Sequence, residues 1–201
     1  MINNAILTES LPAPEVDRAE ALRYAGMRDS TPEAMALLEE CIREAEGRLV
    51  YKVCYRMLDI SHFGGSVDLG FATVNSPSVA KRLTGCNKII LFCATVGVGI
   101  DRLIARYSVS SPARAVMLQA LGSERVEALC DSFCLRIDGE ASRFDGSTTM
   151  RFSPGYGDLP LDLQREIFAS LECSRRIGVS LGENLFMTPT KSVTAIIGVK
   201  M

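Results

Sequence analysis

The chain has 201 residues, of which 47% are hydrophobic and 23% charged, and its formal net charge at pH 7 is -2. These values are ordinary for a globular protein with one sizeable core, and they exclude a disordered chain. The basic residues are scattered and form no stripe that would neutralise a phosphate backbone, so we expect no nucleic-acid partner.

No apolar run is long enough to cross a membrane. The longest, over residues 89–100, is interrupted by Thr95 and two glycines, and it falls short of the roughly 20 residues that a span needs. The N-terminus shows no basic segment followed by an apolar one, as an export signal would. We therefore expect a cytoplasmic protein without a membrane partner.

The cysteines and the single histidine do not form a recognisable ligand set. Seven cysteines with no C-x-x-C pair support neither a paired disulfide framework nor a zinc site, so we interpret them as reduced thiols. Cys130 and Cys134 would share a helix face. Two ligands of a soft metal and two small core side chains both fit that spacing, and the second is much the commoner.

The predicted elements begin with two helices. Apolar spacing predicts a helix over residues 15–27, and Thr31-Pro32 is typical of the start of a second one. Residues 49–58 then alternate as a half-buried strand does. We expect residues 1–48 to form an N-terminal helical arm and residues 49–201 an α+β domain, the two folding as one cooperative unit.

The middle of the chain contains the strongest patterns. Ser76-Pro77 opens a short helix, and residues 88–95 form a nearly continuous apolar run typical of a central strand. Ser111-Pro112 then begins the longest predicted helix, which extends to about Asp138 with an apolar stripe along one side.

The last third of the chain starts with a loop. Residues 146–158 are loop-like, residues 160–172 return to helical spacing, and residues 192–199 are rich in strand-forming side chains. Strands alternate with helices of unequal length and no βαβ period repeats. We therefore predict an α+β fold and not a doubly wound sheet.

The turn Gly97-Val98-Gly99 is a first candidate for chemistry. It follows a predicted strand and precedes a helix, where a nucleotide-binding fold places its glycine turn. The third glycine and the ribose-binding acid are missing. A Rossmann-type methyltransferase and a tight structural turn both remain open as interpretations.

The segment from Arg151 to Tyr156 is more informative. An arginine offers paired donors to a carboxylate, and a tyrosine ring offers its face to a sulfonium or an adenine. Pro154 stiffens the loop between them and Gly155 permits close approach. Such a loop suits a zwitterionic ligand, although a surface turn with a solvated arginine fits the same residues.

This segment resembles the R-x-x-x-G-Y motif of the reactivation (activation) domain of cobalamin-dependent methionine synthase. Residues 178–194 are similar to the family's next block, G-x-x-L-T-E-S-x-x-M-x-P followed by S-V-S, and residues 120–128 resemble the helix whose acidic residue faces the ligand, with Glu127 as the match. The matching residues of the second block are Gly178, Leu181, Glu183, Met187, Pro189, Ser192 and Val193. The resemblance covers about residues 76–199.

The resemblance implies a twisted antiparallel β-sheet with flanking helices and a shallow groove for S-adenosylmethionine. Arg151 is expected to pair with the methionine carboxylate, and Glu127 or Asp145 to face the ammonium or sulfonium. A solvated helix carboxylate is the alternative for Glu127. The binding residues implied in this way are Arg151, Tyr156, Ser153, Gly155, Glu127 and Asp145.

The function implied is that of a reactivation subunit within methionine synthase (5-methyltetrahydrofolate-homocysteine methyltransferase) activity, not of a complete enzyme. When a partner's cobalamin is oxidised to the inactive cob(II) state, an external reductant, such as a flavodoxin-like protein, and S-adenosylmethionine restore methylcobalamin. Cobalamin is expected only through the corrinoid-binding methionine synthase subunit, because the chain has no D-x-H-x-x-G motif and His62 lies in a turn-like stretch.

Two alternatives remain open. The chain could serve another corrinoid methyltransferase, or it could be a non-catalytic scaffold that has lost ligand binding. Departures from the family pattern bear on the second, because Phe152 and Gly157 stand where the fused enzymes have proline. The sequence also stops at Met201, before the family's C-terminal extension, so we expect a partner or a second copy to complete part of the groove.

Overall fold

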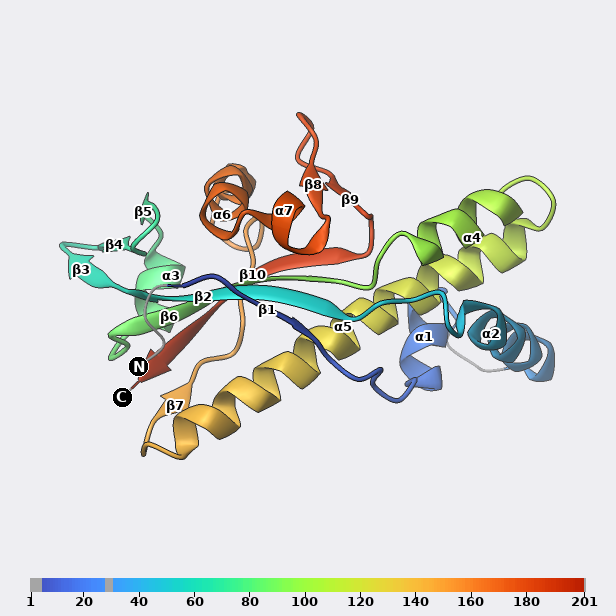
Figure 1. The fold of residues 1–201 in the computed structure, drawn as a ribbon, viewed down its shortest axis with the longest axis horizontal. Coiled ribbons are helices and arrows are strands. Elements are labelled where there is room, and N and C mark those ends of the chain that lie inside the picture. Colours follow the sequence, from blue (N-terminus) through green and yellow to red (C-terminus); the bar gives the residue numbers. More distant parts are fainter. Residues whose placement is uncertain (1–4, 28–30, 201) are drawn as a thin grey trace.

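The computed structural model describes residues 5–27 and 31–200. Five strands form an antiparallel sheet in the order β1-β2-β6-β10-β7, beside a three-stranded and a two-stranded sheet (Figure 1). The strands are β1 (Leu7–Ser10), β2 (Lys52–Asp59), β3 (Ser61–Phe63), β4 (Ser66–Asp68), β5 (Thr73–Val74), β6 (Lys88–Thr95), β7 (Ser147–Thr148), β8 (Ser180–Leu181), β9 (Met187–Thr188) and β10 (Ser192–Lys200). The helices are α1 (Arg18–Tyr24), α2 (Pro32–Ala45), α3 (Pro77–Arg82), α4 (Gly99–Tyr107), α5 (Pro112–Ser142), the 3-10 turn η1 (Leu161–Leu163), α6 (Gln164–Leu171) and α7 (Cys173–Ile177).

The middle strand β6 explains why residues 88–95 read as a continuous apolar run. β6 pairs with β2 on one side and with β10 on the other. Ile90 and Phe92 belong to the hydrophobic cluster that includes α5, whereas Ile89 and Leu91 belong to the cluster that includes α3, α6 and α7. A strand covered on both faces needs apolar side chains at every position. The predicted α+β fold, an antiparallel sheet with flanking helices, is confirmed.

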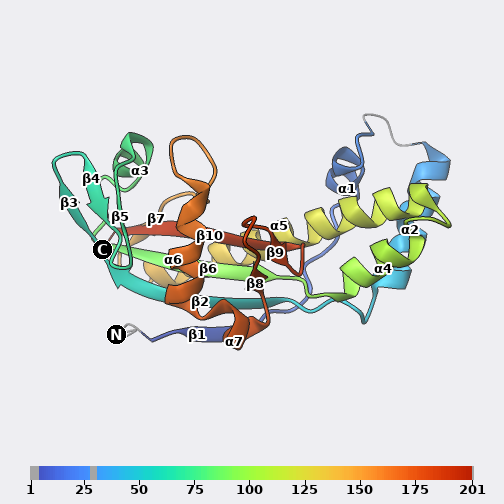
Figure 2. The ribbon, with the colours of Figure 1, turned by 90° about the horizontal axis from the view of Figure 1, so that it is seen from above.

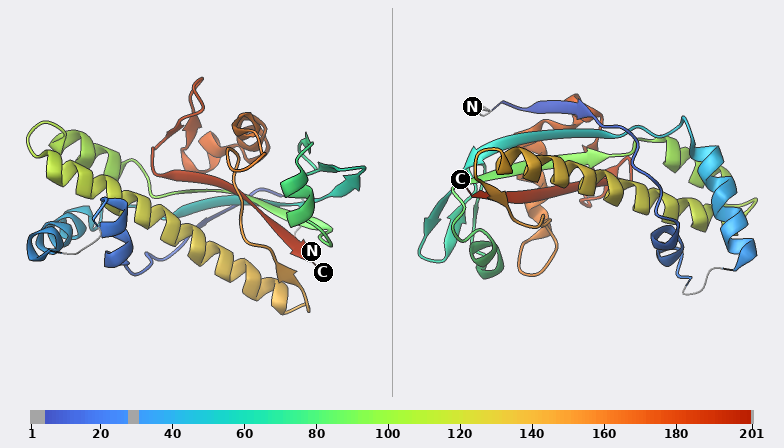
Figure 3. Two further views of the ribbon diagram at one scale, coloured as in Figure 1. Left: turned by 180° about the vertical axis from the view of Figure 1, so that it is seen from behind. Right: turned by 90° about the horizontal axis from the view of Figure 1, so that it is seen from below.

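Helix α5 covers one face of the sheet and continues past its end (Figure 3). It has 31 residues, which at ~1.5 Å per residue gives about 46 Å. Phe133 of α5 packs against Phe92 of β6 and Tyr55 of β2, with ring centroids 4.9 Å and 5.1 Å apart. Such pairs contribute about 0.5–1.5 kcal/mol beyond the area they bury. They hold the C-terminal half of α5 against the central strands of the sheet.

The opposite face of the sheet is covered by α6 and α7 (Figure 2). The helix predicted over residues 160–172 begins as η1, continues as α6 and stops at Leu171. Glu172 follows in the left-handed region at φ 51°, which ends a helix. Its carboxylate pairs with Arg175 and, at 3.2 Å, with Arg176 of α7. The chain thereby turns sharply between two short helices.

The first 48 residues are not all helical. β1 pairs antiparallel with β2 at the edge of the main sheet. This strand was not predicted, because its four residues are too few for an alternating pattern to stand out. The helices α1 and α2 pack against α5. The division at residue 48 and the single cooperative unit both remain proposals. The position of β1 in the main sheet supports the single cooperative unit.

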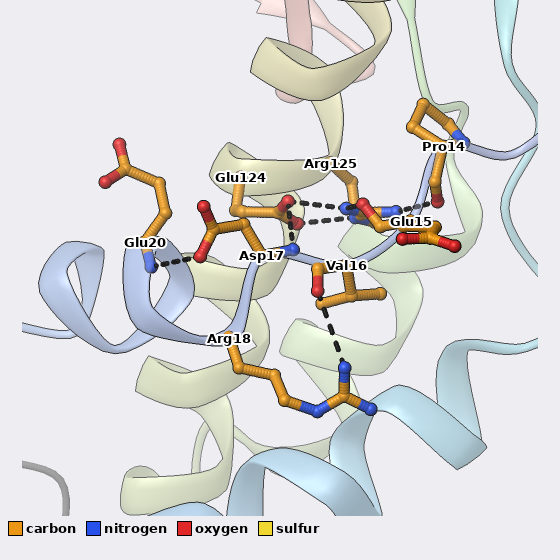
Figure 4. A network of polar contacts seen from close by, with 8 residues as sticks. All are labelled: Pro14, Glu15, Val16, Asp17, Arg18, Glu20, Glu124 and Arg125. Carbon is orange, nitrogen blue, oxygen red and sulfur yellow. Dashed lines mark hydrogen bonds and ion pairs between the residues drawn. The ribbon is translucent and has the colours of Figure 1, made fainter.

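A buried ion pair holds the segment before α1 on α5 (Figure 4). Glu124 and Arg125 are each only 2% exposed. Arg125 donates to the Glu124 carboxylate and, at 2.6 Å, to the carbonyl oxygens of Pro14 and Glu15, while Glu124 accepts from the Asp17 N–H at 3.0 Å. Buried charges are stable when each has its partners. This network ties the N-terminal segment to the long helix.

The hairpin of β3 and β4 lies at the end of the molecule opposite α4 (Figure 1). The single histidine, His62, is exposed in β3. Its exposure agrees with the interpretation as a solvated residue, and it lies in a strand and not in the turn-like stretch that the sequence predicts. In the described part of the chain, no helix is both long and apolar enough to span a membrane.

Candidate functional site

Arg151 enters the candidate site from the edge of the main sheet. The next residue, Phe152, forms an isolated bridge with Ile196 of β10, with N···O distances of 3.0 and 2.8 Å. Phe152 packs with the α6 side, where the Arg82 guanidinium lies 5.7 Å from its ring centroid. Successive side chains of an extended segment point to opposite faces. Arg151 therefore faces α5.

On α5, Arg151 meets two carboxylates. Its Nη2 donates to Glu127 and its Nη1 to Asp131, residues four apart that share one helix face. The Arg151 side chain is 23% exposed, against 65% for Asp131. Burial by itself lowers the pKa of Arg151, but the hydrogen bond with Asp131 and the nearby carboxylate charges outweigh it and raise the pKa. The guanidinium is therefore always charged.

The cluster carries an excess of negative charge. Two carboxylates, Glu127 and Asp131, face one guanidinium, and no second basic side chain in the described ranges forms an ion pair with either. A net negative charge favours a ligand with cationic groups. Arg151 and Glu127 are predicted from the sequence to share one site, and the structure brings them together. Asp131 was not predicted, although its spacing of four from Glu127 was the available signal.

Two glycines shape the loop that follows. Gly155 and Gly157 have φ values of 89° and 62°, in the region that favours glycine. The Gly155 N–H donates to the Leu159 carbonyl at 2.9 Å, and a Cβ at Gly155 would lie 3.1 Å from Leu161. The loop therefore reverses tightly and presents Tyr156 at its tip.

A carboxylate that was not predicted from the sequence anchors this loop. Asp158 accepts hydrogen bonds from the hydroxyl of Ser76 at 2.5 Å and from the N–H of Ser78 at 3.1 Å, and also from the Ser78 hydroxyl. These bonds, that of Ser76 foremost, lower the pKa of Asp158 to about 2. The sequence marked Ser76 only as a helix cap, a role that it also fills by accepting from the Val79 N–H at 3.2 Å. The loop is thereby attached to the start of α3.

Tyr156 projects into solvent. It is 77% exposed, and its N–H donates to the Ser153 carbonyl at 3.4 Å. Ser153 is half-buried and Gly155 is exposed. The structure thus places these three predicted binding residues in one loop beside Arg151. The ring of Tyr156 is free to cover a ligand because no core packing engages it.

Asp145 lies away from this cluster. It occupies the turn after α5 at φ 57°, and its N–H donates to the Ser142 carbonyl at 3.3 Å. From Asp131 to Ser142 the helix advances about 16 Å at ~1.5 Å per residue. The structure does not bring Asp145 to Arg151, so only Glu127 of the two predicted carboxylates faces that guanidinium.

A second cation lies one helical turn from Glu127. The Nζ of Lys191 donates to the Ser123 hydroxyl at 2.9 Å, and its backbone carbonyl accepts from the Val96 N–H at 3.1 Å. Burial lowers the pKa of Lys191, against an opposing effect of Asp101. Lys191 was not predicted from the sequence. Ser123, Glu127 and Asp131 therefore form a row on one face of α5, with Lys191 at the Ser123 end and Arg151 at the Asp131 end.

The glycine turn between β6 and α4 has a packing explanation. Gly97 has φ 80°, and a Cβ at Gly99 would lie 2.0 Å from the Arg48 carbonyl oxygen. The strand before the turn belongs to an antiparallel sheet, whereas a Rossmann fold requires a parallel one. Of the two interpretations, the structure supports the tight structural turn.

Cys130 and Cys134 do lie on one stretch of α5. Cys130 is buried and Cys134 half-buried, and burial raises the pKa of both thiols. A raised pKa disfavours the thiolate that metals bind. Across residues 5–27 and 31–200, no group of three or more His, Cys, Asp or Glu side chains is arranged to hold a metal ion. Cys130 belongs to the hydrophobic core, and Cys134 packs against it.

Comparison with known proteins identifies relatives of this architecture. A family model described as the activation domain of vitamin B12 dependent methionine synthase matches residues 76–200. No curated protein sequence matches the chain. A crystal structure of the MetH reactivation domain bound to AdoHcy is similar in fold, with a TM-score of 0.74 and 16% sequence identity, over 96% of this chain and 78% of that one. The similarity in fold thus extends to segments before residue 76.

Proposed function

Because the chain belongs to the family of vitamin B12-dependent methionine synthase activation domains, we propose that it binds S-adenosylmethionine and supports the reductive methylation of cobalamin on a partner protein. In this proposal it is a free-standing reactivation subunit. The partner is a corrinoid-binding methionine synthase subunit that brings the cobalamin, and the electron comes from a flavodoxin-like reductant. The observation that carries the proposal is the cluster of Arg151, Glu127 and Asp131 beside the loop with Tyr156 at its tip.

The charges of the cluster match those of the ligand. S-adenosylmethionine carries one carboxylate and two cationic groups, an ammonium and a sulfonium. The guanidinium of Arg151 has five N–H donors, of which two are occupied by Glu127 and Asp131. Donors therefore remain for the ligand carboxylate, while the two carboxylates of α5 attract the cationic groups.

The loop offers the contacts that a nucleoside needs. The exposed ring of Tyr156 can stack on adenine or face the sulfonium. Ser153, which is half-buried, and Gly155, which is exposed, add a hydroxyl and backbone groups within the same loop. Asp158 holds the loop against α3, so its shape is set before a ligand arrives, which reduces the ordering cost of binding.

Bound S-adenosylmethionine supplies the methyl group that reduced cobalt accepts. The role of this chain is then to hold and orient the donor. Arg151 is half-buried against α5, whereas Tyr156 at the loop tip is exposed. The ligand would therefore lie shallow, with its sulfonium side open to a corrinoid presented by the partner. Orientation of this kind is a large part of what positioning residues contribute to a transfer reaction.

One observation favours the scaffold alternative. Arg151 already has two carboxylate partners within the chain, as an arginine with a purely structural role would have. If the chain is a scaffold, these ion pairs are the only role of Arg151, and S-adenosylmethionine does not bind to it.

A reconstitution assay tests the proposed function. A methionine synthase subunit in the cob(II)alamin state is mixed with reduced flavodoxin and S-adenosylmethionine, with or without this chain. We expect methylcobalamin to form only when the chain is present, and we expect the chain alone to make no methionine from homocysteine and methyltetrahydrofolate. If recovery were equal without the chain, the proposal would fail. If the chain restored methylcobalamin only on another corrinoid methyltransferase, that enzyme would be its client.

A further inference from the structure

A pocket of about 290 Å³ lies at the helical end of the molecule, away from the Arg151 loop. Its lining consists of Arg48, Gly99, Arg102, Leu103 and Arg106. Arg48 follows α2, and the others belong to α4. Figures 1 and 2 show α2 and α4 together at the end opposite the β3–β4 hairpin.

Three guanidinium groups gather at this pocket with little counter-charge. The Nε of Arg48 donates to the Glu44 carbonyl at 2.9 Å, and Arg106 reaches the Glu44 carboxylate only at 3.5 Å. Within the described residues, the guanidinium of Arg102 has neither a hydrogen bond nor an ion pair. Arg102 and Arg106 are four apart on α4, and like charges at this spacing destabilise a helix.

Glu44, the carboxylate that pairs with Arg106 among the described residues, is shared with other side chains. Glu44 also accepts from the Tyr107 hydroxyl at 2.8 Å and lies 3.6 Å from Arg114. It therefore cannot neutralise the arginines of the pocket by itself. A concentration of one charge without matching partners attracts counter-ions.

The backbone fixes how close these arginines lie to one another. A Cβ at Gly99 would lie 2.0 Å from the Arg48 carbonyl oxygen, so only glycine lets the start of α4 pack against the residue that follows α2. This contact brings Arg48 beside Arg102 and Arg106. The grouping therefore follows from the tertiary fold and not from the sequence of one helix.

We propose that this pocket binds a phosphoanhydride, the two linked phosphates of pyrophosphate or of a nucleoside diphosphate. Two phosphate groups carry roughly three negative charges near pH 7, and three guanidinium groups can neutralise them through paired hydrogen bonds. The proposal does not depend on S-adenosylmethionine binding, because none of the pocket's residues belongs to the Arg151 cluster.

Titration calorimetry on the full chain tests this inference, with pyrophosphate, ADP and AMP as ligands and sulfate as a control. It is done at about 0.15 M salt, where diffuse charge effects are screened. We expect one-to-one binding of pyrophosphate, with sulfate at least tenfold weaker. If ADP binds tighter than pyrophosphate, the source is a nucleotide; the reverse order points to free pyrophosphate. The absence of heat with both would overturn the proposal.

Substitutions test whether the ligand binds in this pocket. Arg102→Glu should weaken pyrophosphate or ADP binding at least tenfold, and Arg102→Gln should weaken it less. Arg143→Glu is the matched control, because it makes the same charge change at the exposed C-terminal end of α5 and should alter affinity less than twofold. Thermal unfolding of each variant verifies that it is folded. Equal effects at Arg102 and Arg143 would mean that only net charge matters, and the pocket would then not be the site.

Discussion

The guanidinium of Arg151 donates a hydrogen bond to the carboxylate of Glu127, which lies 24 residues earlier in the chain. This contact joins the loop that contains Tyr156 to the long helix α5. Asp131, one turn further along α5, holds the same guanidinium from a second direction. The arginine is therefore oriented before any ligand arrives.

Replacing Arg151 by lysine tests its paired donors. Arg151→Lys keeps the charge, but a single ammonium cannot serve Glu127, Asp131 and a ligand carboxylate with parallel hydrogen bonds. We expect S-adenosylmethionine affinity to fall about tenfold to a hundredfold, which corresponds to a loss of ~1.5–3 kcal/mol. Calorimetry measures this, with Arg143→Lys as a control. Unchanged affinity would make the scaffold interpretation the better one.

The same substitution should have a modest effect on stability. From the sequence alone, a loop arginine that waits for a ligand contributes almost nothing to folding. The two ion pairs change this expectation, and because Asp131 is largely exposed, we expect a loss of about 0.5–1 kcal/mol at most. Urea denaturation of the ligand-free protein measures it.

Replacing Tyr156 separates binding from folding. The exposed ring of Tyr156 contributes little to the core, so Tyr156→Ala should change the free energy of unfolding by less than about 0.5 kcal/mol. Loss of a cation–π contact at an exposed site costs ~0.5–1 kcal/mol, so affinity for S-adenosylmethionine should fall about twofold to fivefold. Tyr156→Phe keeps the ring and should bind like the parent. Equal binding by all three proteins would remove the tyrosine from the site.

The anchor at Asp158 predicts a pH-dependent loop. Its hydrogen bonds lower the pKa from 3.8 to about 2. A carboxyl whose pKa is lower in the folded state stabilises that state above its unfolded pKa, and this stabilisation is lost as the pH falls from about 4 to about 2. Asp158→Asn should therefore increase hydrogen exchange of residues 153–159 at neutral pH, and the difference from the parent should shrink near pH 2. A difference that stayed constant over this range would contradict the assignment.

The buried pair of Glu124 and Arg125 makes the N-terminal segment part of the folding unit. Glu124→Gln leaves a buried guanidinium without its counter-charge and should cost about 3–5 kcal/mol, whereas Glu124→Gln combined with Arg125→Met should recover most of that loss. Urea denaturation followed by circular dichroism measures both. A single transition in the parent supports one cooperative unit. Two transitions would separate the arm from the rest.

The elements that could be predicted are those with long, regular patterns. β6 is covered on both faces and α5 is packed along much of its length, so their periodicity is visible without any structure. Strands of two to four residues, such as β1, β7 and β8, leave no pattern of their own. They form because a neighbouring strand offers backbone partners, which is a property of the fold and not of the local sequence.

The candidate site also has residues that could be predicted from the sequence and residues that could not. Arg151, Tyr156 and Glu127 were predicted from a resemblance of motifs, and Gly155 from its backbone freedom, whereas Gly157 was noted only as a departure from the family's proline. Asp158 and Ser76 are 82 residues apart, and nothing in the sequence around either one indicates the other. Asp145 was assigned to the site by resemblance, but α5 extends to Ser142 and carries it to the far end of the helix.

Titration calorimetry of the intact chain with S-adenosylmethionine, and in parallel with S-adenosylhomocysteine, tests the central claim most directly. Both are titrated without added metal into the parent protein, and thermal unfolding is recorded with and without each ligand. We expect one-to-one binding of both and a rise in the unfolding temperature, because a ligand that binds only the folded state stabilises it. If saturating ligand produced neither heat nor a thermal shift, the cluster of Arg151, Glu127 and Asp131 would not be a binding site for S-adenosylmethionine.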